Sequence, residues 1–175
     1  GLGLTVVWNA VQDHGGYIFV HSDSSGTRFE LLFPAIRQPV APRKEDVSFE
    51  EIRGQGEFIL VVDDLIEQQN IALTILDSLG YRAKAVNTGQ EAVSFIKSQP
   101  VDLVILDMIM APSISGLETY RRIKEISPGQ KAVIASGYAV SEDVTQAQAI
   151  GAGSFVKKPY TVLEMGIAIK EELEK

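Results

Sequence analysis

The chain has 175 residues, of which 45% are hydrophobic, and its formal net charge at pH 7 is -7, which fits one or two globular domains. No apolar run reaches the roughly 18 to 20 residues that cross a bilayer, and the chain does not begin like a signal peptide, so we expect a cytoplasmic protein without membrane contact. The absence of cysteine excludes disulfides, thiolate metal sites and cysteine nucleophiles, and the acidic balance argues against nucleic-acid binding.

Residues 1–33 are predicted to form one helix followed by a β-hairpin. The His-Gly-Gly sequence at residues 14–16 should end the helix, and β-rich runs follow at residues 17–20 and 27–33. The apolar stripe of the helix consists of Leu4, Val7, Trp8 and Val11. One helix and one hairpin are too few to fold alone, so we expect this segment to pack against the rest of the chain or against a second copy, which would give a homodimer.

A linker is predicted next. Pro34, Pro39 and Pro42 lie near a run of mixed charges at residues 43–46, and such stretches rarely form packed elements. The first residue is a glycine, and we expect the chain to be a fragment of a longer protein. The expected organisation is an N-terminal segment at residues 1–33, a linker at 34–56 and a second domain at 57–175.

After the linker, short β-rich runs alternate with helical patterns. The expected strands are residues 58–62, 82–86, 101–106, 132–135 and 154–156. The expected helices are residues 67–79, 90–97, 117–126, 143–150 and 162–174. This strict alternation predicts an α/β fold with a five-stranded parallel, doubly wound sheet that helices cover on both faces. The first and third strands are continuously apolar, as central strands buried on both faces are.

Three carboxylates follow these strands at the edge where a sheet of this kind binds its ligands. Asp63 and Asp64 come directly after the first strand, and Asp107 comes directly after the third. Left unpaired, the three carboxylates would repel one another and raise one another's pKa. A hard cation fits such a cluster of oxygen ligands, and Mg2+ is the cofactor we expect.

A hydroxyl and an ammonium group follow the last two strands at the same edge. Ser136 comes after the fourth strand, and Lys157, Lys158 and Pro159 come after the fifth. Taken singly, each polar residue here has an ordinary explanation as a helix cap, a turn residue or part of a solvated loop. Together, a carboxylate nucleophile, a divalent cation, a hydroxyl and a lysine predict a site that forms an aspartyl phosphate.

Four short sequences at these strand ends carry a family resemblance. They are Val61-Val62-Asp63-Asp64, Leu106-Asp107-Met108, Ala135-Ser136-Gly137 and Val156-Lys157-Lys158-Pro159-Tyr160. They resemble the signature of response-regulator receiver domains, and the resemblance covers residues 57–175. It implies a flavodoxin-like strand order 2-1-3-4-5 and a role in two-component phosphorelay signalling. The implied partner is a histidine kinase or a histidine phosphotransfer domain, whose phosphohistidine donates the phosphoryl group.

The resemblance also implies roles for the acidic residues. Asp107 would be the phosphoacceptor. Asp64, Asp107 and the backbone carbonyl of Ile109 would ligate Mg2+, while Asp63 would act largely through a metal-bound water.

For the remaining site residues, the resemblance implies roles in binding the phosphoryl group and in switching conformation. Ser136 would bind a phosphoryl oxygen in the active state, and Lys158 would pair with the phosphate. Phe155 would be the aromatic residue that turns inward on activation. A cis peptide bond is expected between Lys158 and Pro159.

The segment after Asp107 departs from the family pattern. It is one residue longer than is common, and Pro112 is displaced by one position. The side chain of Ile109, expected to border the phosphoryl group, is aliphatic and cannot orient an attacking water by hydrogen bonding. Neither the loop geometry nor the phosphoryl lifetime follows from the pattern.

The N-terminal segment resembles the end of a histidine kinase ATP-binding domain. The matching sequences are Gly1-Leu2-Gly3-Leu4, His14-Gly15-Gly16 and Ser25-Gly26-Thr27-Arg28-Phe29. The parent protein would then be a hybrid histidine kinase with a C-terminal receiver. The rest of the nucleotide site is absent, and neither His14 nor His21 matches the phosphodonor histidine. We therefore expect residues 1–33 to bind no ATP, and this fragment to catalyse only its own aspartyl phosphorylation.

Two other functions use similar residues. A phosphatase of the haloacid dehalogenase type also has an Asp nucleophile, Mg2+ and a lysine on a parallel sheet, but it needs a second Asp two residues after the nucleophile, where Ile109 stands. A pseudo-receiver binds partners without phosphorylation and usually lacks an acidic residue or the lysine. Here Asp63, Asp64, Asp107 and Lys158 are all present.

Overall fold

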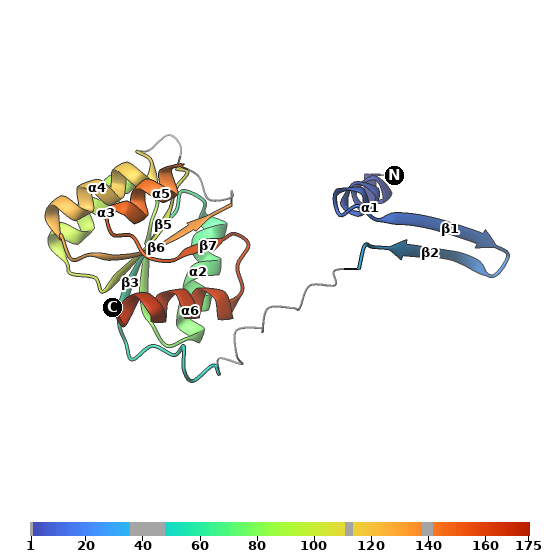
Figure 1. Ribbon diagram of the computed structural model, residues 1–175. Helices are drawn as coiled ribbons and strands as arrows, with labels where there is room; N and C mark the ends of the chain where they lie inside the picture. The colour runs from blue at the N-terminus through green and yellow to red at the C-terminus, as the bar shows by residue number, and fades with distance from the viewer. Residues whose placement is uncertain (1, 36–47, 111–113, 138–141) are drawn as a thin grey trace. The chain divides into compact units, whose positions relative to one another are not determined.

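The computed structural model describes residues 2–35, 48–110, 114–137 and 142–175. The chain divides into two compact units, Gly1–Glu45 and Asp46–Lys175 (Figure 1). None of the helices within the described ranges is long and apolar enough to cross a membrane. Part of the predicted linker, residues 36–47, and the displaced proline of the loop, Pro112, lie outside the described residues.

The first unit is a helix followed by a hairpin, as its sequence predicts. Helix α1 (Leu2–Asp13) ends where Gly15 adopts a φ of 63°, and the amides of Gly15 and Gly16 donate to carbonyls in its last turn. This backbone pattern closes a helix and suits glycine, which tolerates a positive φ. Strands β1 (Tyr17–Asp23) and β2 (Gly26–Leu32) then pair antiparallel.

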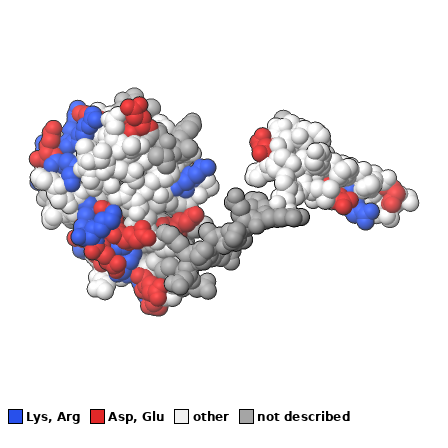
Figure 2. Space-filling model, viewed as in Figure 1, with Lys and Arg blue, Asp and Glu red and all other residues white. Residues whose placement is uncertain are grey.

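Most apolar side chains of the first unit are exposed. Val11 is buried, but the other members of the predicted helical stripe are at least 38% exposed. The exposed apolar side chains of the hairpin are Tyr17, Phe19, Val20, Phe29, Leu31 and Leu32. Figure 2 shows correspondingly little charge over much of the visible surface of this unit. The packing of this surface against the rest of the chain or a second copy stays a prediction.

A five-stranded parallel sheet forms the centre of the second unit. Its strands are β3 (Phe58–Val62), β4 (Arg82–Val86), β5 (Leu103–Asp107), β6 (Lys131–Ser136) and β7 (Phe155–Lys157). They lie in the order β4-β3-β5-β6-β7, which confirms the predicted flavodoxin-like order 2-1-3-4-5. The inner strands β3, β5 and β6 are almost entirely buried, which accounts for their apolar sequences.

Helices cover both faces of this sheet (Figure 1). One face carries α2 (Ile66–Ser78) and α6 (Val162–Leu173), and the other carries α3 (Gly89–Ser98), α4 (Gly116–Ile126) and α5 (Glu142–Ala149). Successive strand side chains point to opposite faces, so each face has its own hydrophobic core. The predicted strands and helices of this unit agree with the observed ones to within two residues at each end.

The residues just before β3 pack on the second unit. Ile52 is buried in the same core as side chains of α2 and α6, and its carbonyl accepts a hydrogen bond from the hydroxyl of Tyr81 at 3.2 Å. The amide of Gly54 donates to the carbonyl of Leu79 at 2.8 Å. The last residues of the segment expected to be a linker are therefore anchored to the domain that follows it.

Candidate functional site

Three carboxylates meet at the carboxyl ends of β3 and β5, as the sequence predicts. The pairing of Val62 with Leu106 brings the ends of the two strands level, so Asp63 and Asp107 lie side by side. Carboxylate oxygens of Asp63, Asp64 and Asp107 all lie within 4.8 Å of one another. Asp63 and Asp107 are buried and Asp64 is half-buried, so the cluster opens to solvent on the side of Asp64.

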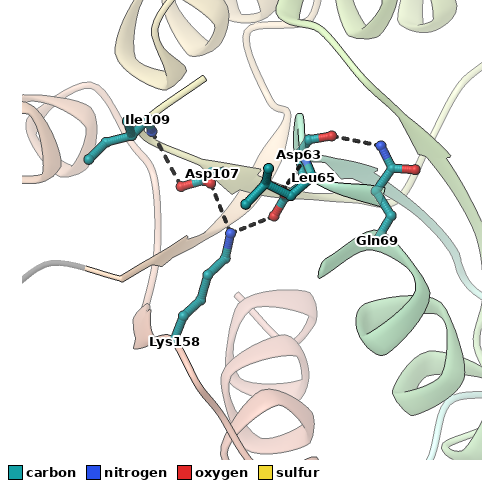
Figure 3. Close-up of polar contacts among 6 residues, drawn as sticks. All are labelled: Asp63, Leu65, Gln69, Asp107, Ile109 and Lys158. Atoms are coloured by element: carbon teal, nitrogen blue, oxygen red, sulfur yellow. Dashed lines mark hydrogen bonds and ion pairs between the residues drawn. The ribbon is translucent and has the colours of Figure 1, made fainter. Parts of the chain in front are cut away.

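Lys158 lies between two of these carboxylates (Figure 3). Its Nζ is 2.5 Å from Oδ2 of Asp63 and 2.9 Å from Oδ2 of Asp107, and the side chains of all three residues are at most 11% exposed. The backbone amide of Lys158 donates to the carbonyl of Ser136 at 2.8 Å. The predicted cis peptide bond between Lys158 and Pro159 is confirmed. At the end of β7, Lys157 is exposed instead.

In both Asp63 and Asp107, a backbone amide binds the carboxylate oxygen that Lys158 does not contact. The amide of Leu65 donates to Oδ1 of Asp63 at 3.0 Å, and the amide of Ile109 donates to Oδ1 of Asp107 at 3.3 Å. The carboxylates of Asp63 and Asp107 therefore each accept a hydrogen bond from an amide on one oxygen and from Lys158 on the other. Such two-sided hydrogen bonding fixes the direction of the carboxylate plane.

Burial and charge act in opposite directions on the pKa values of this group. Burial raises the pKa of Asp107, while the hydrogen bond and charge of Lys158 pull it down. Burial alone would lower the pKa of Lys158, but its hydrogen bonds to Asp63 and Asp107 outweigh burial and raise it. The pKa of Asp107 stays raised above its ordinary value, because the contact of Lys158 with its Oδ2 offsets only part of the effect of burial. The pKa of Lys158 is also raised, so the lysine is cationic at neutral pH.

A cavity of about 450 Å³ opens above the acidic cluster. Its lining joins the predicted site residues with apolar neighbours, namely Asp64, Leu65, Gln68, Asp107, Ile109, Ser136, Gly137, Lys158 and Pro159. Ser136 ends β6, and its pairing with Lys157 brings it next to the lysine loop. The side chain of Ile109 is largely exposed, whereas Phe155 is half-buried and packs against the core below α3, α4 and α5.

The donor set fits a hard divalent cation. All three side chains that converge offer carboxylate oxygens, which suit Mg2+ or Ca2+ rather than a soft metal. The charge of Lys158 does not balance the charges of three neighbouring carboxylates. A bound cation would relieve the repulsion that remains among them. On its open side, the cavity leaves room for the waters that Mg2+ retains and for phosphate oxygens that would also bind it.

Two structural partners of the site were not predicted from the sequence. The side chain of Gln69 donates to the backbone carbonyl of Asp63 at 2.7 Å, and Gly116 lies against the backbone of Asp107 and Met108. A glutamine inside a helical pattern looks like a surface residue, so only its position one turn after the acidic pair offers any signal. The glycine at the start of α4 looks like an ordinary helix boundary.

Comparison with known proteins gives a consistent set of relatives. A family model described as the response regulator receiver domain matches residues 59–170. Sensor kinase CckA of Brucella abortus is 27% identical over 100% of this chain and 20% of its own length. The autoinducer 1 sensor kinase/phosphatase LuxN of Vibrio campbellii is 28% identical over 93% of this chain and 21% of its own length. The chain thus spans about a fifth of these relatives.

A solved structure of a similar protein has the same fold as the second unit. The crystal structure of a response regulator receiver domain protein (CheY-like) from Methanospirillum hungatei superposes with a TM-score of 0.64 at 26% identity. The match covers 68% of this chain and 94% of that one.

Proposed function

The chain belongs to the response regulator receiver domain family, and from that membership we propose that its second unit accepts a phosphoryl group on Asp107. The geometry of Lys158 carries this proposal, since its ammonium bridges Asp63 and Asp107 on the floor of an open cavity. An ordinary surface lysine or a capping aspartate would not be buried in this way. The setting is two-component phosphorelay signalling, to which the receiver family belongs.

The reaction transfers the phosphoryl group from a phosphohistidine to a carboxylate. An oxygen of Asp107 attacks phosphorus, the P–N bond to the imidazole breaks, and its electron pair stays on the imidazole nitrogen. The products are an acyl phosphate and a free histidine. The amide of Ile109 holds the other oxygen of Asp107, and Lys158 neutralises charge as the phosphoryl oxygens approach.

Asp64, Asp107 and the carbonyl of Ile109 would hold Mg2+, and Asp63 would act largely through a metal-bound water; the three carboxylates converge as this proposal requires. The bound ion supplies charge neutralisation on the transferring group. The three carboxylates provide the oxygen ligands, and the half-buried position of Asp64 leaves the cluster open toward the incoming phosphate. Phosphorylation without a divalent cation should therefore be slow.

The conformational response is assigned to Ser136 and Phe155. Ser136 lines the cavity and is buried, which supports the proposal that its hydroxyl bonds a phosphoryl oxygen on Asp107. Phe155 begins the neighbouring strand β7 and is half-buried, which supports the proposal that it turns inward on activation. The two residues are joined through the pairing of β6 with β7.

The parent protein is proposed to be a hybrid histidine kinase. Support comes from CckA and LuxN, both sensor kinases, whose matches extend over 100% and 93% of this chain and so reach into the first unit. Residues 1–33 are the proposed end of the kinase ATP-binding domain, residues 34–56 its connection, and residues 57–175 the receiver. The proposed partners are a histidine kinase or histidine phosphotransfer domain in the cytoplasm, with no nucleic acid or membrane contact by this fragment.

Intact mass spectrometry tests the proposal. The chain is incubated with acetyl phosphate with and without Mg2+, beside Asp107→Ala. We expect the mass of one phosphoryl group to be gained by the wild-type chain with Mg2+, and none by the variant. Stoichiometric labelling of Asp107→Ala would overturn the assignment, and a wild-type chain that takes no phosphoryl group would favour a phosphorylation-independent pseudo-receiver.

A further inference from the structure

Gln69 is a buried amide that the proposed chemistry does not use. It lies near the start of α2, is 9% exposed, and donates from Nε2 to the carbonyl of Asp63 at 2.7 Å (Figure 3). The same nitrogen donates to Oδ1 of Asn87 at 2.9 Å. A backbone carbonyl can only accept a hydrogen bond, so the nitrogen of the amide must face Asp63. The amide therefore joins the turn after β3 to the turn after β4.

The carbonyl that Gln69 holds belongs to the peptide unit between Asp63 and Asp64. A peptide unit is planar, so fixing its oxygen fixes the directions in which both residues leave it. The Asp63 amide also donates to the carbonyl of Val86 at 3.2 Å, and the Leu65 amide and Lys158 hold the Asp63 carboxylate itself. Of these contacts, only the one from Gln69 is made to the carbonyl between Asp63 and Asp64. Leu65, the residue before α2, offers no side-chain cap, and its amide binds the side chain of Asp63 and not the carbonyl that Gln69 holds.

We propose that Gln69 is a positioning residue that sets the orientation of the Asp63–Asp64 carboxylate pair and thereby the affinity of the site for a divalent cation. This inference rests on the proposed function of the acidic cluster. The residue touches neither the cation nor the phosphoryl group, and it acts through the backbone of Asp63. Outer partners of metal ligands typically change metal affinity about 10-fold to 100-fold when they are removed.

Three substitutions in the full chain separate this role from a general effect on folding. Gln69→Leu removes both hydrogen bonds while keeping the length of the side chain similar. Asn87→Ala removes the bond to the β4 turn and leaves the one to Asp63 intact. Asn70→Leu makes the same amide-to-leucine change one residue further along α2, at an exposed position.

The probe is Mg2+ alone, titrated calorimetrically into each variant without a phosphodonor, with the urea unfolding curve measured in parallel. We expect Gln69→Leu to raise the Mg2+ dissociation constant about 10-fold or more, Asn87→Ala to raise it less than about 3-fold, and Asn70→Leu to leave it unchanged. With acetyl phosphate, the rate of Gln69→Leu at saturating Mg2+ should return to within about 3-fold of wild type, since only the cation affinity is altered.

Several results would overturn the inference. One is a Gln69→Leu variant that folds and binds Mg2+ like wild type, and another is an equal loss for Gln69→Leu and Asn87→Ala. If Gln69→Leu does not fold, Gln69→Met takes its place, because a thioether of similar length cannot donate to the carbonyl of Asp63 and adds no charge near the cation site, and normal Mg2+ affinity in that variant would be equally contrary. A wild-type chain that binds Mg2+ but takes no phosphoryl group would count against the proposed function while leaving the role of Gln69 to be decided by the titration.

Discussion

At the scale of single residues, Lys158 and the proposed Mg2+ would share the same carboxylates. The ammonium contacts Oδ2 of both Asp63 and Asp107, so it holds the two strand ends together through charge-assisted hydrogen bonds. In the proposed reaction, an arriving phosphoryl group would offer this lysine new oxygens at the same place. Lys158 would then stabilise the resting site and neutralise the phosphorylated one without moving far.

Replacing Lys158 with alanine should slow phosphorylation by about 100-fold, because one preorganised donor to the developing charge is lost. Lys157→Ala is the matched control. Its side chain is exposed on the adjacent residue, and its loss should change the rate less than about 2-fold. The measurement is the initial rate of labelling by acetyl phosphate at saturating Mg2+. Equal defects in the two variants would contradict the assignment of Lys158.

At the scale of secondary-structure elements, the start of α4 packs against the end of β5 beside Asp107. Its first residue, Gly116, donates from its amide to the carbonyl of Met108 at 3.1 Å, which closes the turn after the phosphoacceptor. A methyl group on Gly116 would meet the carbonyl oxygen of Asp107 and lie 2.7 Å from the Cα of Met108. Helix α4 and the end of β5 are thus packed backbone to backbone.

Gly116→Ala should lower the free energy of unfolding by about 1 to 3 kcal/mol, because the methyl group overpacks this contact. Gly129→Ala is the control, since nothing lies within 4 Å of a methyl group there, and it should change stability by less than about 0.5 kcal/mol. Urea unfolding measures both. If the alanine at position 116 were as harmless as the one at position 129, the close approach of α4 to Asp107 would be disproved.

Tyr120 lies on the same helix and should make the free energy of unfolding depend on pH in the alkaline range. Its hydroxyl donates to the carbonyl of Gln130 at 3.0 Å, and burial raises its pKa from 10.0 to about 12, with a smaller contribution from the charge of Glu172. The unfolded chain ionises first as the pH rises, so the stability due to this group is complete below pH 10.0 and is lost toward pH 12.

Below pH 10.0, Tyr120→Phe should be less stable than wild type by about 1 kcal/mol, since it lacks the hydrogen bond. Between pH 10.0 and 12 the wild-type chain should lose this advantage at about 1.4 kcal/mol per pH unit, so that the Phe variant becomes the more stable protein. Urea curves of both proteins at a series of pH values make the comparison. A difference that stayed constant with pH would be inconsistent with a buried, neutral Tyr120.

How far the sequence predicts these features depends on how local their signal is. Alternating apolar runs and helical periodicity predict the five strands, the resemblance to receiver domains implies their order, and residues at strand ends predict Asp63, Asp107 and Lys158. Ile52 and Gln69 gave no such signal, because one apolar residue in a charged segment and one amide in a helix have no period. Their roles arise from contacts between residues distant in the chain.

At the scale of the whole molecule, the second unit begins before the segment that the family model matches. Ile52 is 1% exposed and fills a place beside Gly166 on α6, where it meets the core of α2 and α6. The matched segment starts only at residue 59. The connection from the first unit is therefore fastened to the two helices on one face of the receiver sheet.

Ile52→Ala should lower the free energy of unfolding of the second unit by about 2 to 5 kcal/mol, the usual cost of emptying a buried isoleucine site. Phe49→Ala is the control three residues earlier, because its side chain is 62% exposed and its removal should cost less than about 0.5 kcal/mol. Urea unfolding followed by far-ultraviolet circular dichroism provides the comparison. Equal stability of the two variants would mean that the segment before β3 is not part of the folded unit.

The claim on which the whole account depends is that Asp107, rather than its neighbours Asp63 and Asp64, takes the phosphoryl group. Borohydride reduces an aspartyl phosphate to homoserine, so the modified position is preserved through digestion and can be located by peptide mass spectrometry. The chain is treated with acetyl phosphate and Mg2+, reduced, digested and sequenced. We expect homoserine at position 107, and homoserine at position 63 or 64 instead would contradict the assignment of Asp107 as the phosphoacceptor.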